Sequence, residues 1–166
     1  GPIIDEASLL KLYTQLDRLV TGDVLVLAGS IPASLPDNIY QDIMKRVEAK
    51  GVMTIVDARK DLLENVLELR PFLIKPNNFE LAELFGLEEL WDKQEVLRYA
   101  KELQERGARN VLVSMAGAGA VLAAEDGSTY ESPAPDGTVI NSVGAGDSMV
   151  AGFLYGLLTT ESFEQA

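Results

Sequence analysis

Cysteine and histidine are both absent from the 166 residues of this chain. Their absence excludes disulfides, thiol nucleophiles and zinc sites built from Cys and His. It also excludes a Ser-His-Asp relay, so any general base must be an Asp, Glu, Lys or Tyr side chain.

Positively charged side chains are scarce: 14 Lys and Arg stand against 26 Asp and Glu, which gives a net charge of −12. A nucleic-acid surface needs clustered cations to neutralise phosphates, so nucleic acid is not expected as a partner. The cations are also unevenly placed, because all of them lie at or before Arg109 and residues 111–166 contain none. The last third of the chain therefore contributes no cationic side chain to anything it binds.

Long hydrophobic runs are missing as well. No apolar stretch approaches the roughly 20 residues that a membrane helix needs, and the N-terminus lacks a signal-peptide pattern. The hydrophobic content of 47% is sufficient for the core of a single domain, which we expect to span residues 1–166. We expect a soluble, cytoplasmic protein with no membrane partner.

Apolar runs and helical periodicities alternate along the chain, and glycines and prolines mark the ends of the segments. The expected helices cover residues 5–20, 34–51, 61–69, 79–85, 92–106 and 145–158, the expected strands 23–29, 52–57, 72–75 and 110–114, and a hairpin joins 120–124 to 128–132. Alternation of strands and helices favours right-handed crossovers between parallel strands. We predict an α/β fold of three layers, α/β/α, in which a parallel sheet carries helices on both faces.

Small or polar residues follow four of the predicted strands: Gly29-Ser30, Asp57, Lys75-Pro76-Asn77 and Ser114. Each alone has an ordinary structural explanation; Asp57, for example, could cap a helix. Because the carboxyl ends of parallel strands share one edge of the sheet, where ligands bind, the four together favour a binding site.

A glycine-rich turn directly precedes the last predicted helix. With Gly144, Ala145 and Gly146 at the helix start, backbone amides are accessible and the helix dipole favours an anion there. Asp147 falls in the first turn, where its ordinary role would be to complement the dipole. Because Gly costs up to about 1 kcal/mol in a helix, two glycines at this start indicate the close approach of a ligand.

Other phosphate-binding motifs do not fit. No string matches a P-loop, and Gly117-Ala118-Gly119 lacks the third glycine of a dinucleotide fingerprint and continues into a strand, which disfavours an NAD-linked oxidoreductase. Farther along the last helix, Gly152 is expected to allow tight helix packing.

Several motifs stand in a recognisable order. The core Gly144-Ala145-Gly146-Asp147 lies within residues 141–152, Asn77-Asn78-Phe79-Glu80 reads N-x-x-E, and residues 114–119 form a small turn before an apolar strand. Residues 28–32 and 75–77 follow two earlier strands. Together these motifs resemble those of the PfkB (ribokinase-like) carbohydrate kinases, and residues 75–77 are typical of the branch that acts on sugar phosphates.

The resemblance implies transfer of a phosphoryl group from Mg·ATP to a sugar hydroxyl. It assigns Asp147 as the general base and the helix start at 144–147 as catalytic, since the amides of residues 145–147 form an anion hole. It further implies that Asn77 and Glu80 orient Mg²⁺ and its waters near the ATP phosphates, with Glu80 acting through water.

The same resemblance implies a set of nucleotide-binding residues: Asn77, Glu80, Ser114, Met115, Ala116, Gly117, Ala118, Gly119, Gly146 and Asp147. Ala116 departs from the family, which usually has a glycine there, and a methyl group is tolerable only if φ is negative. Because the last third lacks Lys and Arg, we expect the transferred phosphate to be held by amides and metal.

The implied substrate is fructose 1-phosphate, converted to fructose 1,6-bisphosphate, with tagatose 6-phosphate phosphorylated at its 1-hydroxyl as the alternative. Family members are about twice as long as this chain. We therefore expect a fragment that lacks the N-terminal sugar-binding and lid part and the extreme C-terminus, and that is inactive alone.

Three further points stay open. A non-catalytic nucleotide-binding fragment is the alternative from another class of function. The resemblance implies a homodimer for the full-length protein, and it favours a native origin for Gly1-Pro2 over a protease-cleavage remnant.

Overall fold

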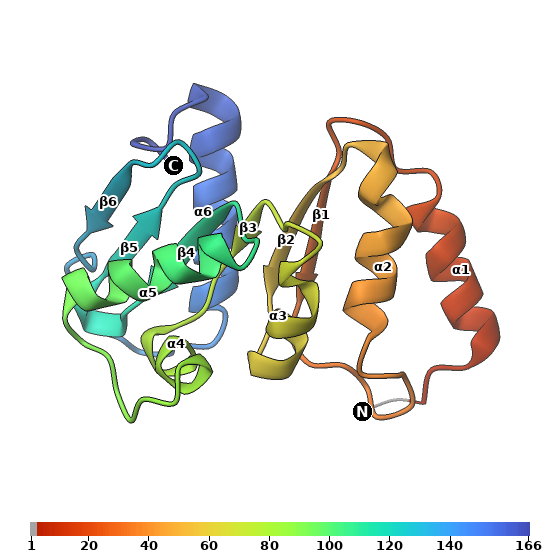
Figure 1. Cartoon of the computed structure of the whole chain (residues 1–166), viewed down its shortest axis with the longest axis horizontal. Helices are drawn as coiled ribbons and strands as arrows, with labels where there is room; N and C mark the ends of the chain where they lie inside the picture. The colour runs from red at the N-terminus through yellow and green to blue at the C-terminus, as the bar shows by residue number, and fades with distance from the viewer. Residues whose placement is uncertain (1–2) are drawn as a thin grey trace.

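The computed structural model describes residues 3–166, Lys60 through its backbone alone, so the origin of Gly1-Pro2 lies outside the described residues. Its centre is a six-stranded sheet with the strands in sequence order (Figure 1). The strands are β1 (Val24–Ala28), β2 (Met53–Asp57), β3 (Leu73–Ile74), β4 (Asn110–Ser114), β5 (Ala120–Ala123) and β6 (Thr129–Ser132).

The first four strands run parallel, while β5 and β6 are antiparallel to their neighbours. The predicted strands and the hairpin are thus confirmed, and the sheet as a whole is mixed. The reason is the length of the connections: β4, β5 and β6 follow one another through short turns, and only a longer crossover returns the chain in the parallel sense.

Helices cover both faces of the sheet. One face carries α1 (Glu6–Leu16), α2 (Ile39–Val47), α3 (Lys60–Leu67), α4 (Asn78–Leu84) and α5 (Lys93–Glu105). The other carries α6 (Ala145–Thr160), which Figure 1 shows behind the strands. Two short 3₁₀ turns, η1 (Glu48–Lys50) and η2 (Ala116–Ala118), complete the chain. The predicted three-layer arrangement is confirmed.

Side-chain alternation along the strands produces two hydrophobic clusters. Val56 and Ile74 point into the layer of α1 to α5, whereas Ile55 and Leu73 pack towards α6, and all four are fully buried. The α6 layer covers β1 only in part, since Val24 packs against its cluster. Val26, which pairs with Ile55, is 44% exposed on that side.

Several helix boundaries differ from the prediction, and for two of them the structure shows the reason. The first helix ends at Leu16 because Asp17 caps it and the chain then turns, held by the Asp23 carboxylate, which accepts the Val20 amide at 2.9 Å. The second helix begins only at Ile39. Ser34 does not cap it, since its hydroxyl oxygen accepts the backbone amide of Ile4 at 2.9 Å.

The expectation for Gly152 is wrong. A Cβ atom at this position would meet no atom within 4 Å, whereas one at Gly156 would overlap the backbone of Gln165. Close packing of α6 therefore occurs one turn later than expected. Across residues 3–166, the helices are all too short or too polar to cross a bilayer.

Candidate active site

The carboxyl ends of β1 and β2 open into a cavity of about 930 Å³. Gly29, Ser30 and Asp57 line it together with Glu80 of α4 and Asp147 of α6. The sequence-predicted residues from distant segments therefore share one edge of the sheet. Six carboxylates face this cavity and offer the oxygen ligands that Mg²⁺ prefers: Asp37, Asp57, Asp61, Glu80, Glu83 and Asp147.

The start of α6 is shaped by Gly144, which has a left-handed φ of 80° and precedes the first helical residue. The Ala145 amide donates to the Ser142 carbonyl at 3.1 Å. Among the described residues, the amides of Gly146 and Asp147 donate no hydrogen bond. Two of the three amides expected to form an anion hole are thus free, beside the exposed Asp147 side chain.

A cation reaches this helix start from another strand. Lys75, directly after β3, is 6% exposed, and its Nζ lies 3.3 Å from an Asp57 carboxylate oxygen. The same Nζ is 3.1 Å from the place that a Cβ atom on Gly146 would occupy. The expectation that amides and metal hold a phosphate here considered only residues 111–166, whereas the tertiary structure also brings the Lys75 ammonium to this helix start.

Asn77 and Glu80 form a capping box at the start of α4. The Asn77 side-chain oxygen accepts the amides of Phe79 and Glu80 at 2.9 and 2.8 Å, and a Glu80 oxygen accepts the Asn77 amide at 2.9 Å. The N-x-x-E spacing is itself a signal for this motif, which sequence reasoning had missed. Both side chains thus have a structural role in addition to the one that the resemblance implies.

The turn at residues 114–119 lies beside Asn77, but none of its residues lines the cavity. Ser114 forms a parallel bridge with Asn77 and donates its amide to the Pro76 carbonyl at 3.1 Å. Met115 is fully buried, and its amide donates to the Gly119 carbonyl at 2.8 Å, so the structure exposes no group of this residue to a nucleotide. Ala116 has a φ of 47°, so the condition under which its methyl group was tolerable is not met.

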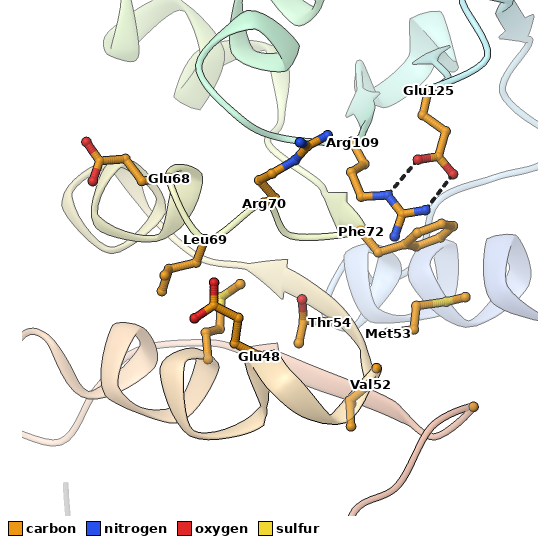
Figure 2. A pocket seen from close by; sticks show the side chains of 13 residues that line it. Glu48, Val52, Met53, Thr54, Glu68, Leu69, Arg70, Phe72, Arg109 and Glu125 are labelled. Carbon is orange, nitrogen blue, oxygen red and sulfur yellow. Dashed lines mark hydrogen bonds and ion pairs between the residues drawn. The ribbon is translucent and has the colours of Figure 1, made fainter.

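A second hollow of about 750 Å³ lies at the opposite edge of the sheet, near the start of β2 (Figure 2). Figure 2 shows Arg109 paired with Glu125 above the Phe72 ring; the ion pair is 2.6 Å and the guanidinium lies 4.9 Å from the ring centroid. None of the sequence-predicted site residues lines this hollow. The candidate site is therefore the cavity at the carboxyl edge.

Free amides at a helix start, a carboxylate and a buried ammonium meet at the carboxyl edge of the sheet. This arrangement in an α/β fold is typical of proteins that bind phosphate groups at the carboxyl edge of the sheet. Residues 3–166 match the model of the pfkB family carbohydrate kinases. The chain belongs to that family.

Individual relatives agree with this assignment. Over 166 residues the chain is 41% identical to the 1-phosphofructokinase of Bacillus subtilis (strain 168), covering 100% of this chain and 54% of that protein. Over 154 residues it is 34% identical to the D-tagatose-1-phosphate kinase of Bacillus licheniformis, covering 93% and 50%.

A solved structure is similar as well. Phosphofructokinase-2 from Escherichia coli in complex with fructose-6-phosphate has a TM-score of 0.87 and 27% identity, covering 98% of this chain and 53% of that chain. The chain thus spans about half the length of the relatives it matches. The comparisons confirm the predicted family and the truncated ribokinase-like α/β fold.

Proposed function

We propose that the protein carrying this chain is an ATP-dependent sugar-phosphate kinase. The observation that supports this most directly is the meeting of Asp147, two free amides and the Lys75 ammonium at one edge of the sheet. Amides and a cation stabilise a transferring phosphoryl group, and an adjacent exposed carboxylate can accept a proton.

In the proposed reaction, the sugar hydroxyl oxygen forms a bond to the γ-phosphorus of ATP while the bond from that phosphorus to ADP breaks. The Asp147 carboxylate takes the hydroxyl proton. The amides of Gly146 and Asp147 and the Lys75 ammonium stabilise the negative charge on the transferred group. Each of these groups lies in the first turn of α6 or against it.

The carboxylates of the cavity fit a magnesium ion that arrives with the nucleotide. Within residues 3–166, no group of three or more acidic side chains is arranged to hold a metal by itself. Phosphate oxygens would therefore supply part of the coordination, with Glu80 orienting the metal-bound water. When bound, Mg²⁺ neutralises phosphate charge, and the side chains of this chain orient the metal and its water.

Fructose 1-phosphate, phosphorylated at its 6-hydroxyl, is the substrate we propose, because the relative with 41% identity is a 1-phosphofructokinase. Tagatose 6-phosphate is the alternative derived from the motifs. The D-tagatose-1-phosphate kinase adds tagatose 1-phosphate as a third candidate. A coupled assay of ADP production by the longest natural form of the protein, run with each sugar phosphate, ranks the three candidates.

Several properties of the whole protein belong to the same proposal. Residues 1–166 would form a single nucleotide-binding domain of a longer kinase, inactive without the remainder, and the whole kinase would be a cytoplasmic homodimer. ATP and a small phosphosugar would be its substrates, and neither nucleic acid nor a membrane would be a partner. Sugar-dependent ADP release by the 166 residues alone would contradict the assignment of sugar binding to another part.

The decisive variant is Asp147→Asn in the longest natural form. We expect kcat to fall by about 100-fold or more, with little change in nucleotide affinity, because the general base is lost while the amides remain. Glu95→Gln is the matched control, since Glu95 is also a first-turn carboxylate, at the start of α5. Unchanged turnover in Asp147→Asn would contradict the assigned role.

Calorimetry with Mg·ADP, read together with the turnover assay, distinguishes a kinase from a non-catalytic nucleotide-binding fragment. Binding without turnover of any of the three sugar phosphates would favour the non-catalytic nucleotide-binding fragment. Absence of binding at millimolar nucleotide would contradict a functional nucleotide site in this chain.

A further inference from the structure

The ion pair between Asp57 and Lys75 joins the carboxyl ends of two neighbouring parallel strands. Val56 and Ile74 are register partners, so the residues that follow them emerge side by side from β2 and β3. Lys75 is 6% exposed and the Asp57 side chain 19%. Because a buried ammonium is costly without a partner, Asp57 makes the buried position of Lys75 tolerable.

The Lys75 ammonium makes a single ion pair of ordinary length. Its Nζ–O distance to Asp57 is 3.3 Å, close to the 3.2 Å of the more exposed pair between Lys93 and Glu131. An ammonium has three donors, so a single contact leaves donors for another acceptor. Asp57 also lines the same cavity as Asp147, which places the pair at the site and not behind it.

The backbone of Gly146 lies against this ion pair. A Cβ atom there would stand 3.1 Å from the Lys75 Nζ and 3.6 Å from an Asp57 carboxylate oxygen. The pair is therefore packed directly against the backbone whose amides are free. A phosphate oxygen that accepts those amides would arrive within reach of the ammonium.

We propose that Asp57 is a positioning residue that fixes the Lys75 ammonium under the first turn of α6. This inference rests on the proposed function. The lysine ammonium is a compact point charge on a flexible four-carbon stem. It therefore stabilises a phosphoryl group effectively only when it is held in place. Asp57 supplies that restraint, and Lys75 with the two amides then forms one preorganised anion site.

A double-mutant cycle on the longest natural form tests the proposal, with Asp57→Asn, Lys75→Met and both together. We expect kcat to fall about 10-fold to 100-fold in Asp57→Asn and further in Lys75→Met, with the double variant no worse than Lys75→Met. The Mg²⁺ concentration for half-maximal activity should stay unchanged in Asp57→Asn. Losses that multiply, or a shifted Mg²⁺ requirement, would show that Asp57 acts on substrate or metal directly and overturn the proposal.

A second measurement does not depend on kinase activity. Acylation of Lys75 by an amine reagent, followed by mass spectrometry, should be slow in the unmodified protein and at least about 10-fold faster in Asp57→Asn. Equal labelling rates would overturn the positioning role even if the protein proves not to be a kinase. Conversely, an inactive unmodified protein whose Lys75 labelling responds to Asp57 contradicts only the proposed function.

Two controls complete the design. Asp17→Asn breaks the exposed pair with Arg46 and should leave both kcat and Lys75 labelling unchanged. If Asp57→Asn unfolds at the assay temperature, Asp57→Ser replaces it in both measurements, and the same outcomes decide.

Discussion

The Nζ of Lys75 lies 3.1 Å from the place that a Cβ atom on Gly146 would occupy. The first turn of α6 therefore accepts no side chain at this position unless Lys75 moves. This contact joins the end of a parallel strand to a helix start far away in sequence, and it explains why a glycine stands inside the first helical turn.

Gly146→Ala is expected to displace the ammonium and lower kcat by about 100-fold, a loss comparable to removing one donor from an anion hole. The free energy of unfolding should not fall much, because alanine favours a helix by up to about 1 kcal/mol over glycine. Gly152→Ala, in the same helix but with open space around it, is the control and should keep full activity. Comparable activity in both variants would argue against the contact. Steady-state kinetics and urea unfolding measure the two effects.

The capping box at α4 allows structural and functional roles to be separated. Glu80→Gln retains an oxygen that can accept the Asn77 amide, so we expect the free energy of unfolding to change by no more than about 0.5 kcal/mol. Activity should nevertheless need more Mg²⁺, because the charge that orients the metal is lost. Asn77→Ala removes the cap and should cost about 1 kcal/mol of stability. A normal Mg²⁺ requirement in Glu80→Gln would leave Glu80 with the capping role alone.

Ala116 holds a left-handed backbone conformation, with φ at 47°. A Cβ atom makes this conformation unfavourable by roughly 1–2 kcal/mol, whereas glycine adopts it freely. We expect Ala116→Gly to raise the free energy of unfolding by about 1 kcal/mol in chemical denaturation. Ala118→Gly, in the same turn but without a positive φ, is the control and should lower it. The opposite order would show that the turn is not strained at Ala116.

Most of the fold could be predicted because each element carries its own local signal. Continuous apolar runs indicated the buried strands, and the alternation of strand and helix indicated the parallel part of the sheet. The start of α2 was missed because Ser34 lies in a turn closed by the Leu35 amide and the Pro32 carbonyl, and its hydroxyl oxygen accepts the Ile4 amide instead. A local start signal does not reveal that a side chain is used by a distant segment.

The candidate site could likewise be predicted only in part from the sequence. The glycines around Asp147 could be recognised because they lie in one short string, and the strand ends because topology brings them to one edge. The approach of Lys75 to Gly146 could not be recognised, since it depends on how α6 packs across the sheet. The charge distribution along the chain was therefore misleading about the charge distribution in space.

The final prediction concerns Tyr40, whose hydroxyl donates to the carbonyl oxygens of Ala28 and Gly29 at 2.8 and 3.2 Å. Burial, and secondly the charge of Asp57, raise the pKa of Tyr40 above its ordinary value of 10.0. With a higher pKa in the folded state, its contribution to stability is fully present below pH 10.0 and is lost as pH rises through the folded pKa. Tyr40→Phe should therefore flatten the alkaline fall in unfolding free energy, whereas the control Tyr155→Phe, at a side chain 74% exposed, should not. Asp57→Asn should lower the pKa of Tyr40 but leave it above 10.0, since burial is the larger cause; a difference titration by absorbance that placed it at 10.0 or below would contradict this account.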